Sequence, residues 1–204
     1  MKLIIIPCCK VKEEGGRPIY QRSEALWRLL NPLAYDHLME MRKKLAEQFN
    51  LQPGPDLGFN NFSINIEYMP AYRRYVGRIY QRGRVRQLYP VKRFSRLSII
   101  SALYGLLDAD DLIRNYDLAM DCTLPTGTRL YTWWKQQGLC DILCEYVQAL
   151  NPTEIHDLLS GNYRKAVVPW PACIAQTWVK QYDFPRQGLN ANIQRGEILE
   201  MLLH

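Results

Sequence analysis

The chain has 204 residues, of which 48% are hydrophobic and 23% are charged, and its net charge at pH 7 is +6. These values lie close to globular averages and exclude a disordered chain and a coiled coil. The length suffices for one sizeable core, so residues 1–204 are expected to form a single domain.

The apolar run near the start of the chain is short. Leu3 to Ile6 falls far below the ~20 residues of a membrane span and is too short for the core of a signal peptide. We therefore expect a cytoplasmic protein without a membrane partner. Cysteines of cytoplasmic proteins are normally reduced thiols. We therefore expect none of the six cysteines to form a structural disulfide.

Metal ligation is not expected either. No Cys-x-x-Cys is present, and His156 lies well beyond Cys140 and Cys144, which are one helical turn apart. The spacing predicts two half-buried thiols on a helix, with no metal and no cofactor.

The first half of the chain predicts a strand followed by helices. "KLIIIPCCKVK" reads as a short buried strand ended by Pro7, which lacks a backbone donor. Ser23 is expected to cap a helix that begins "EALWRLL", and a second helix is predicted from Tyr35 to Phe49. A loop follows, and then "FSINIEYMPAY" predicts either a strand or an extended arm.

A basic segment comes next. Between Arg73 and Arg96 no residue is acidic, and three tyrosines are interspersed. Its basic residues are Arg73, Arg74, Arg78, Arg82, Arg84, Arg86, Lys92, Arg93 and Arg96.

The second half predicts two more strands and several helices. A second strand covers "RLSIISALY" and turns at Gly105, after which Asp108 and Asp110 are expected to face solvent or to begin a helical turn. A single helix, or a helix pair broken at Gly138, follows. "TEIHDLLSG" is a third buried strand in which His156 is a hydrogen-bonded core residue. "GEILEMLLH" predicts a terminal helix. The order of predicted strands and helices indicates an α/β fold with a mixed, mostly buried central sheet flanked by helices.

Polar residues follow all three predicted strands, at Cys8 to Lys12, Ser101 to Asp117 and Asp157 to Lys165. Ligands of open α/β sheets collect at the carboxyl ends of strands. We therefore expect these three strand ends to converge on one cleft.

The segment "SALYGLLDADDLIRNYDLAM" resembles the signature of the YaaA family (the DUF328 or UPF0246 proteins, associated with peroxide stress). The matching residues are Tyr104, Gly105, Leu107, Asp111, Ile113, Tyr116 and Met120. "IIIPCCK" and "LLSGNYRKAV" are weaker matches in the same order.

The chain departs from that pattern at several places. Cys8 and Cys9 stand where the family usually has proline and alanine, and Asp117 stands where an arginine is common. "YGLL" with a following "YD" is equally typical of the related DUF6884 proteins, and Pro7, Cys8 and Lys12 resemble a step in archaeosine-type tRNA-modifying enzymes. The chain is therefore identified as a member of the YaaA-like superfamily.

The resemblance implies a cytoplasmic α/β protein that limits oxidative DNA damage and can bind nucleic acid. The family's helix-hairpin-helix-like insertion is expected to be absent, because the first two motifs are closer together here. The first hypothesis is binding of nucleic acid, DNA rather than RNA, or of a nucleotide-like small molecule at the cleft. The ligand-binding residues would be Tyr104, Gly105, Tyr116, Asp117, Ser160, Tyr163 and Lys165.

Two other hypotheses stay open. An enzyme acting on a nucleobase or nucleoside would use Cys8, Lys12 and Asp111 as catalytic residues. A peroxide-responsive factor would use a selectively reactive thiol, for which Cys8 is favoured over an inert Cys9. The sequence does not decide whether the protein is an enzyme, nor its oligomeric state.

The basic segment also has two interpretations. Its arginines suit phosphate contacts and its tyrosines suit base stacking. The nucleic-acid-binding residues would then be Arg73, Arg74, Arg78, Arg82, Arg84, Arg86, Lys92 and Arg93. A solvated basic face without a partner is the alternative.

Overall fold

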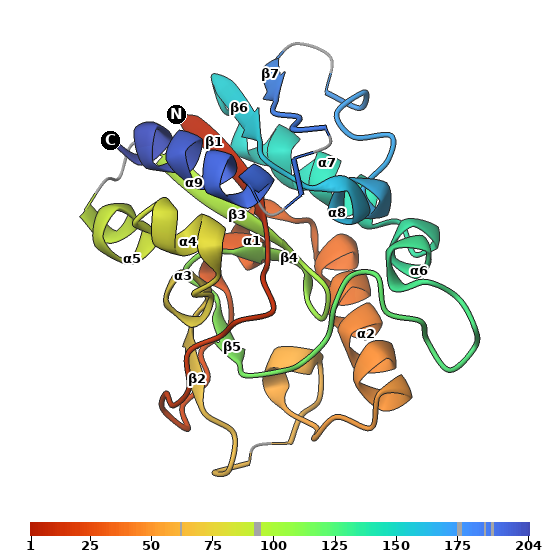
Figure 1. Ribbon diagram of the computed structural model, residues 1–204. Helices are drawn as coiled ribbons and strands as arrows, with labels where there is room; N and C mark the ends of the chain where they lie inside the picture. The colour runs from red at the N-terminus through yellow and green to blue at the C-terminus, as the bar shows by residue number, and fades with distance from the viewer. Residues whose placement is uncertain (62, 92–94, 175–176, 186, 189) are drawn as a thin grey trace.

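A five-stranded sheet forms the centre of this computed structural model (Figure 1). In spatial order its strands are β4 (Gly105–Asp108), β3 (Ser95–Ser101), β1 (Lys2–Pro7), β6 (Glu154–Asp157) and β7 (Trp178–Gln181). β3, β1, β6 and β7 pair in parallel, and β4 is antiparallel at one edge. The predicted mixed α/β fold is confirmed. The structure describes residues 1–61, 63–91, 95–174, 177–185, 187–188 and 190–204.

Helices cover both faces of this sheet. They are α1 (Glu24–Leu29), α2 (Pro32–Gln48), α3 (Ala71–Arg74), α4 (Arg78–Arg82), α5 (Val85–Leu88), α6 (Leu130–Gln136), α7 (Leu139–Leu150), α8 (Gly161–Ala166) and α9 (Asn190–Leu203), with short 3₁₀ turns at Pro55–Leu57 and Tyr89–Val91. α9 crosses in front of β1 and β3 in Figure 1, with α4 packed beside it. α1 and α2 pack with α7 and β4. Within the described residues no helix is long and apolar enough to cross a membrane.

Several sequence predictions are confirmed by these elements. Ser23 Oγ accepts a hydrogen bond from the Leu26 amide and so caps α1. Gly138 separates α6 from α7, with φ +80°. The core histidine is also as predicted, because the His156 ring is 5% exposed and its Nδ1 lies 2.9 Å from the Tyr182 hydroxyl.

The segment after the second predicted strand differs from the expectation. β3 ends at Ser101, and the chain reverses so that Gly105 begins β4 instead of ending a strand. Asp108 therefore lies inside the sheet, 1% exposed, and its carboxylate accepts a hydrogen bond from Arg96 Nε at 2.6 Å. The expectation of a solvent-facing Asp108 is wrong, because β4 places this side chain inside the sheet, where it pairs with the half-buried guanidinium of Arg96. Asp110 is exposed, as expected.

The ambiguous segment near residue 68 is a short strand. β2 (Tyr68–Pro70) pairs antiparallel with β5 (Leu112–Arg114) in a separate two-stranded sheet. The chain that leaves β4 continues into β5, and pairing with β2 fixes the position of β5. This pairing therefore positions residues 115–117, which follow β5 directly.

The expectation of no structural disulfide is also wrong. Cys144 on α7 is bonded to Cys173, 29 residues later in the chain. Both residues lie beside the core, and the loop after α8 brings Cys173 back onto α7.

Candidate functional site

The three strand ends meet at one edge of the sheet. Cys8 directly follows β1, and its Sγ lies 3.2 Å from the hydroxyl of Tyr163, which α8 carries just after β6. Ser101 is the last residue of β3, and its Oγ lies 2.9 Å from the hydroxyl of Tyr116. Parallel strands bring their carboxyl ends to the same edge, so the expected convergence is observed.

A cluster of hydroxyl groups lies at this edge. The Tyr75 hydroxyl is 2.8 Å from that of Tyr116 and donates to Ser101 Oγ at 3.3 Å. Burial raises the pKa of both tyrosines well above the usual value. Both phenols are therefore protonated at neutral pH, and the cluster is uncharged.

Lys12 supplies a positive charge above this cluster. Its backbone forms a bridge with Tyr75, which orients the side chain, and its Nζ lies 4.0 Å from the centroid of the Tyr116 ring. The Nζ donates to the Lys10 carbonyl at 3.2 Å. Burial lowers the pKa of Lys12, while neighbouring Cys8, Cys9 and Asp117 oppose that shift.

We call the following residues the strand-end site: Cys8, Lys12, Tyr75, Ser101, Tyr116 and Tyr163. An open pocket of about 370 Å³ lies at its mouth. The pocket is lined by Lys10, Lys12, Glu14, Asn115, Tyr116 and Asp117. It therefore presents ammonium groups, carboxylates and an amide together.

The neighbouring thiol of Cys9 is held by two hydrogen bonds. It donates to the Val11 carbonyl at 3.1 Å and accepts from the Gly77 amide at 3.2 Å. Burial, followed by the charge of Cys8, raises the pKa of Cys9 to about 12. The thiolate is the nucleophile in cysteine chemistry, so Cys9 lacks the reactive form at neutral pH. Cys8 is 5% exposed and lies under Tyr163.

Comparison with known proteins identifies the family. The model of the family described as peroxide stress protein YaaA matches residues 3–203. The chain belongs to the YaaA family. A UPF0246 protein of Acaryochloris marina (strain MBIC 11017), AM1_4276, is 42% identical over 77 residues, which cover 37% of this chain and 29% of that protein. The matched part thus spans less than a third of that relative.

Of the ligand-binding residues predicted between Tyr104 and Asp117, Tyr116 and Asp117 line the strand-end pocket, whereas Tyr104 and Gly105 are buried behind it. The Tyr104 hydroxyl donates to Asp56 at 2.6 Å and accepts from the Arg114 amide at 3.2 Å. Gly105 packs against Trp134. Tyr104 and Gly105 are buried by these contacts, and they position the turn after β3.

Asp111 lies in another part of the YaaA-family fold. Its Oδ2 accepts a hydrogen bond from the Asp108 amide at 2.9 Å, in the turn between β4 and β5. Ser23 and Arg42 also lie close to it, at the start of α1 and on α2. The structure thus does not bring Asp111 to Cys8 and Lys12, with which the enzymatic hypothesis grouped it.

The titration of Asp111 predicts a pH-dependent stability. Burial first, and the charge of Asp108 second, raise the pKa of Asp111 to about 7, against opposing contributions from Ser23 and Arg42. A raised folded-state pKa means that the folded chain holds a proton which the unfolded chain has released. Stability therefore falls as pH rises from about 4 to about 7, by about 1–4 kcal/mol. Asp111→Asn removes the contribution of Asp111 and leaves that of Asp108, whose pKa burial also raises. Urea unfolding of both proteins across this range measures it, and parallel curves would contradict the assignment.

The predicted residues on α8 face different neighbours. Ser160 precedes the first turn of α8, and its carbonyl accepts from the Arg164 amide at 2.8 Å. Lys165 points to α6, with its Nζ 5.1 Å from the Tyr131 ring centroid. Of the α8 side chains predicted for the cleft, Tyr163 is the one that contacts Cys8 among the described residues.

Three arginines of the basic segment pair with acids from distant parts of the chain. Arg82 bonds Glu197 at 2.8 Å and Arg84 bonds Glu200 at 3.4 Å, both on α9. Arg86 pairs with Glu13 at 2.9 Å. These ion pairs lower the net positive charge that the sequence pattern indicates.

Other residues of the segment are buried or unpaired. Arg74 is fully buried and donates to backbone carbonyls, including that of Glu13, so it cannot contact a nucleic acid in this conformation. Tyr75 and Tyr80 are buried too, which removes two expected stacking faces. Arg73 and Arg78 are exposed and have no carboxylate partner among the described residues. Lys92 and Arg93 lie outside the described residues.

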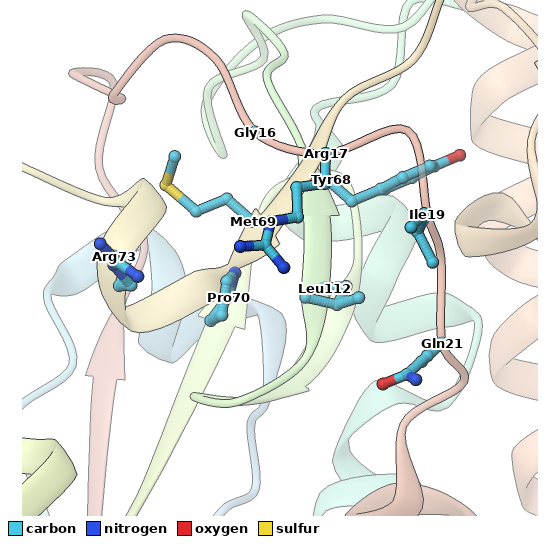
Figure 2. A pocket seen from close by; sticks show the side chains of 9 residues that line it. All are labelled: Gly16, Arg17, Ile19, Gln21, Tyr68, Met69, Pro70, Arg73 and Leu112. Atoms are coloured by element: carbon cyan, nitrogen blue, oxygen red, sulfur yellow. The ribbon is translucent and has the colours of Figure 1, made fainter. Parts of the chain in front are cut away.

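A second cavity, which the sequence did not indicate, lies beside β2 (Figure 2). It measures about 640 Å³ and is lined by Gly16, Arg17, Ile19, Gln21, Tyr68, Met69, Pro70, Arg73 and Leu112. Gly16 has φ +141°, and a Cβ there would lie 2.6 Å from the Tyr68 carbonyl oxygen. In the sequence, the Gly15-Gly16 pair permits this close backbone approach but does not by itself indicate a cavity.

Proposed function

We propose that this YaaA-family protein acts in peroxide stress by binding a phosphorylated nucleoside, free or as part of DNA, at the strand-end site. The observation that carries the proposal is the ammonium of Lys12, which lies over a neutral cluster of hydroxyl groups at the mouth of a pocket. This cation is partly buried and donates to a carbonyl rather than to a carboxylate among the described residues. Such a cation favours an anionic partner, and phosphate is the strongest such group on a nucleotide.

The other groups of the pocket suit the remainder of a nucleotide. Asp117 can accept hydrogen bonds from ribose hydroxyls or base amino groups. Asn115, whose amide donates to Glu14 at 2.8 Å, adds a further donor and acceptor. The mixed lining therefore fits a ligand that carries both phosphate and neutral polar groups.

Replacing Lys12 with alanine should weaken nucleotide binding at least about tenfold, which corresponds to about 1.4 kcal/mol. The loss follows from removing the cation beside the phosphate. Isothermal titration with nucleoside 5′-monophosphates and with a single-stranded DNA oligonucleotide measures it. Lys44→Ala is the matched control, because Lys44 is an exposed lysine on α2 that pairs with Glu40.

The salt dependence of the binding affinity distinguishes DNA from a free nucleotide as the source of the phosphate. DNA binding should weaken steeply with salt concentration, and replacing Arg73 and Arg78 should reduce the salt dependence by about one unit per arginine. A free nucleotide bound only in the pocket should be insensitive to those two changes. Equal affinity of the wild-type and Lys12→Ala proteins for both ligands would overturn the proposal.

A further inference from the structure

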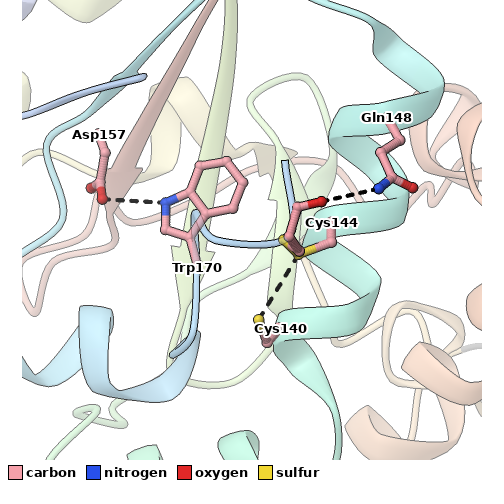
Figure 3. The surroundings of a disulfide bond; sticks show 6 residues. Cys140, Cys144, Gln148, Asp157 and Trp170 are labelled. Carbon is pink, nitrogen blue, oxygen red and sulfur yellow. Dashed lines mark hydrogen bonds between the residues drawn. A yellow bond between two sulfur atoms is a disulfide. The ribbon is translucent and has the colours of Figure 1, made fainter. Parts of the chain in front are cut away.

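Three cysteine sulfur atoms lie together between α7 and the loop that follows α8 (Figure 3). They belong to Cys140, Cys144 and Cys173, and all lie within 4.8 Å of one another. Cys140 and Cys144 are one turn apart on the same face of α7. Cys144 and Cys173 form the disulfide, and the Cys140 thiol lies 3.9 Å from Cys144 Sγ.

We propose that the reduced form of this cluster is a binding site for a thiolate-preferring metal ion of the zinc class. A zinc ion with Zn–S bonds of about 2.3 Å in tetrahedral geometry holds its sulfur ligands about 3.8 Å apart. The separation of 3.9 Å between Cys140 and Cys144 matches that spacing. Cys140 is already a free thiol, and reduction of the disulfide frees the other two ligands, Cys144 and Cys173, at the same place.

The loop carrying Cys173 is held by groups other than sulfur. Trp170 Nε1 donates to the buried carboxylate of Asp157 at 3.2 Å, and Gln148 Nε2 donates to the Cys173 carbonyl at 3.3 Å (Figure 3). Gln148 lies one turn beyond Cys144 on α7. These bonds keep Cys173 beside α7 when the disulfide is open, so the three sulfur ligands are preorganised.

The third cysteine separates this proposal from a simple disulfide. A disulfide needs only Cys144 and Cys173, whereas a trithiolate site needs Cys140 as well. Cys140 and Cys144 are buried and Cys173 is half-buried, so the ion would enter past Cys173. No histidine or carboxylate of the described residues joins the cluster, which leaves a fourth position for water.

Binding replaces three S–H bonds with three metal–sulfur bonds and releases three protons to solvent. The disulfide removes two of the ligands, so the ion and the disulfide exclude one another. This site is separate from the strand-end site, and its test does not depend on nucleotide binding.

The experiment titrates the full-length protein with Cd²⁺, and then with Zn²⁺ in competition, after reduction and removal of the reductant without oxygen. One ion per chain should bind, with a sulfur-to-metal absorption band in the ultraviolet. Cys140→Ser and, separately, Cys173→Ser should weaken binding at least about tenfold. The protein with its disulfide intact should not bind. Cys122→Ser is the control, because Cys122 lies outside the cluster.

Cys173→Ser changes only the loop and leaves α7 intact, so it tests the site if Cys140→Ser does not fold. A reduced wild-type protein that binds no Cd²⁺ would overturn the proposal. Equal binding by wild type and both serine variants would do the same and would show that the three cysteines are simply small buried side chains.

Discussion

Replacing Asp56 with alanine is expected to lower the free energy of unfolding by about 3–5 kcal/mol, the loss typical of removing one partner of a buried ion pair. The Asp56 carboxylate accepts two bonds from Arg114, at 2.5 and 2.9 Å, and its side chain is 1% exposed. It also accepts from Tyr104 at 2.6 Å and Tyr68 at 3.2 Å. Alanine would leave the Arg114 guanidinium buried without its counter-charge.

Urea unfolding measures this loss. Asp36→Ala is the control, because Asp36 is exposed on α2 and should change stability by about 0.5 kcal/mol or less. A loss of less than about 1 kcal/mol for Asp56→Ala would show that solvent reaches Arg114, against its observed burial.

The second large effect is expected for Gly105→Ala. Gly105 has φ +67°, and a Cβ there would lie 2.8 Å from the Trp134 ring. The left-handed backbone costs an alanine about 1–2 kcal/mol, and overpacking against a fully buried tryptophan adds about 1–3 kcal/mol. The free energy of unfolding should therefore fall by about 2–5 kcal/mol.

Gly127→Ala is the matched comparison. Gly127 has φ +85°, and a Cβ at this position would meet nothing within 4 Å. The Gly127→Ala variant should lose only the free energy that the left-handed backbone costs an alanine, about 1–2 kcal/mol. The difference between the two variants in chemical unfolding isolates the contact with Trp134, and equal losses would rule that contact out as a source of strain.

The parallel strands could be predicted because their signals are local. Leu3 to Ile6 in β1 is a continuous apolar run and β3 is buried from Leu97 to Ser101, which is typical of strands covered on both faces. β6 (EIHD) has one apolar residue and was predicted together with the leucines that follow it, Leu158 and Leu159. β7 was missed because it is an edge strand with an exposed tryptophan and lysine and carries no apolar run. The β3–β4 reversal was missed because three apolar residues, rather than a polar turn, connect the two strands.

The candidate site was predictable in part for the same reason. The order of strands places Cys8, Ser101 and Tyr163 at one edge, because each lies at the end of a recognisable strand or in the segment that follows it. The contribution of Tyr75 was not predictable, since its bridge with Lys12 joins segments about 60 residues apart and neither segment is a regular strand. Asp111 was grouped with the site because it lies between Ser101 and Tyr116 in the chain and matches the family signature.

Charge and cysteine patterns misled for another reason. The acids that neutralise Arg82 and Arg84 lie on α9, more than 100 residues away, so the sequence of the basic segment contains no trace of them. Cys144 and Cys173 meet only because the loop after α8 folds back onto α7. Long-range pairs of this kind depend on tertiary packing, which periodicity and local composition do not encode.

The proposed function requires Lys12 to bind the phosphate of a nucleoside at the strand-end site. A crystal structure of the protein grown with a nucleoside 5′-monophosphate would show whether this contact forms. We expect a phosphate oxygen within hydrogen-bond distance of Lys12 Nζ, with the nucleoside against Asn115 and Asp117. A phosphate bound instead at Arg17 and Arg73, in the cavity beside β2, or a nucleotide that occupies neither place, would contradict the proposal.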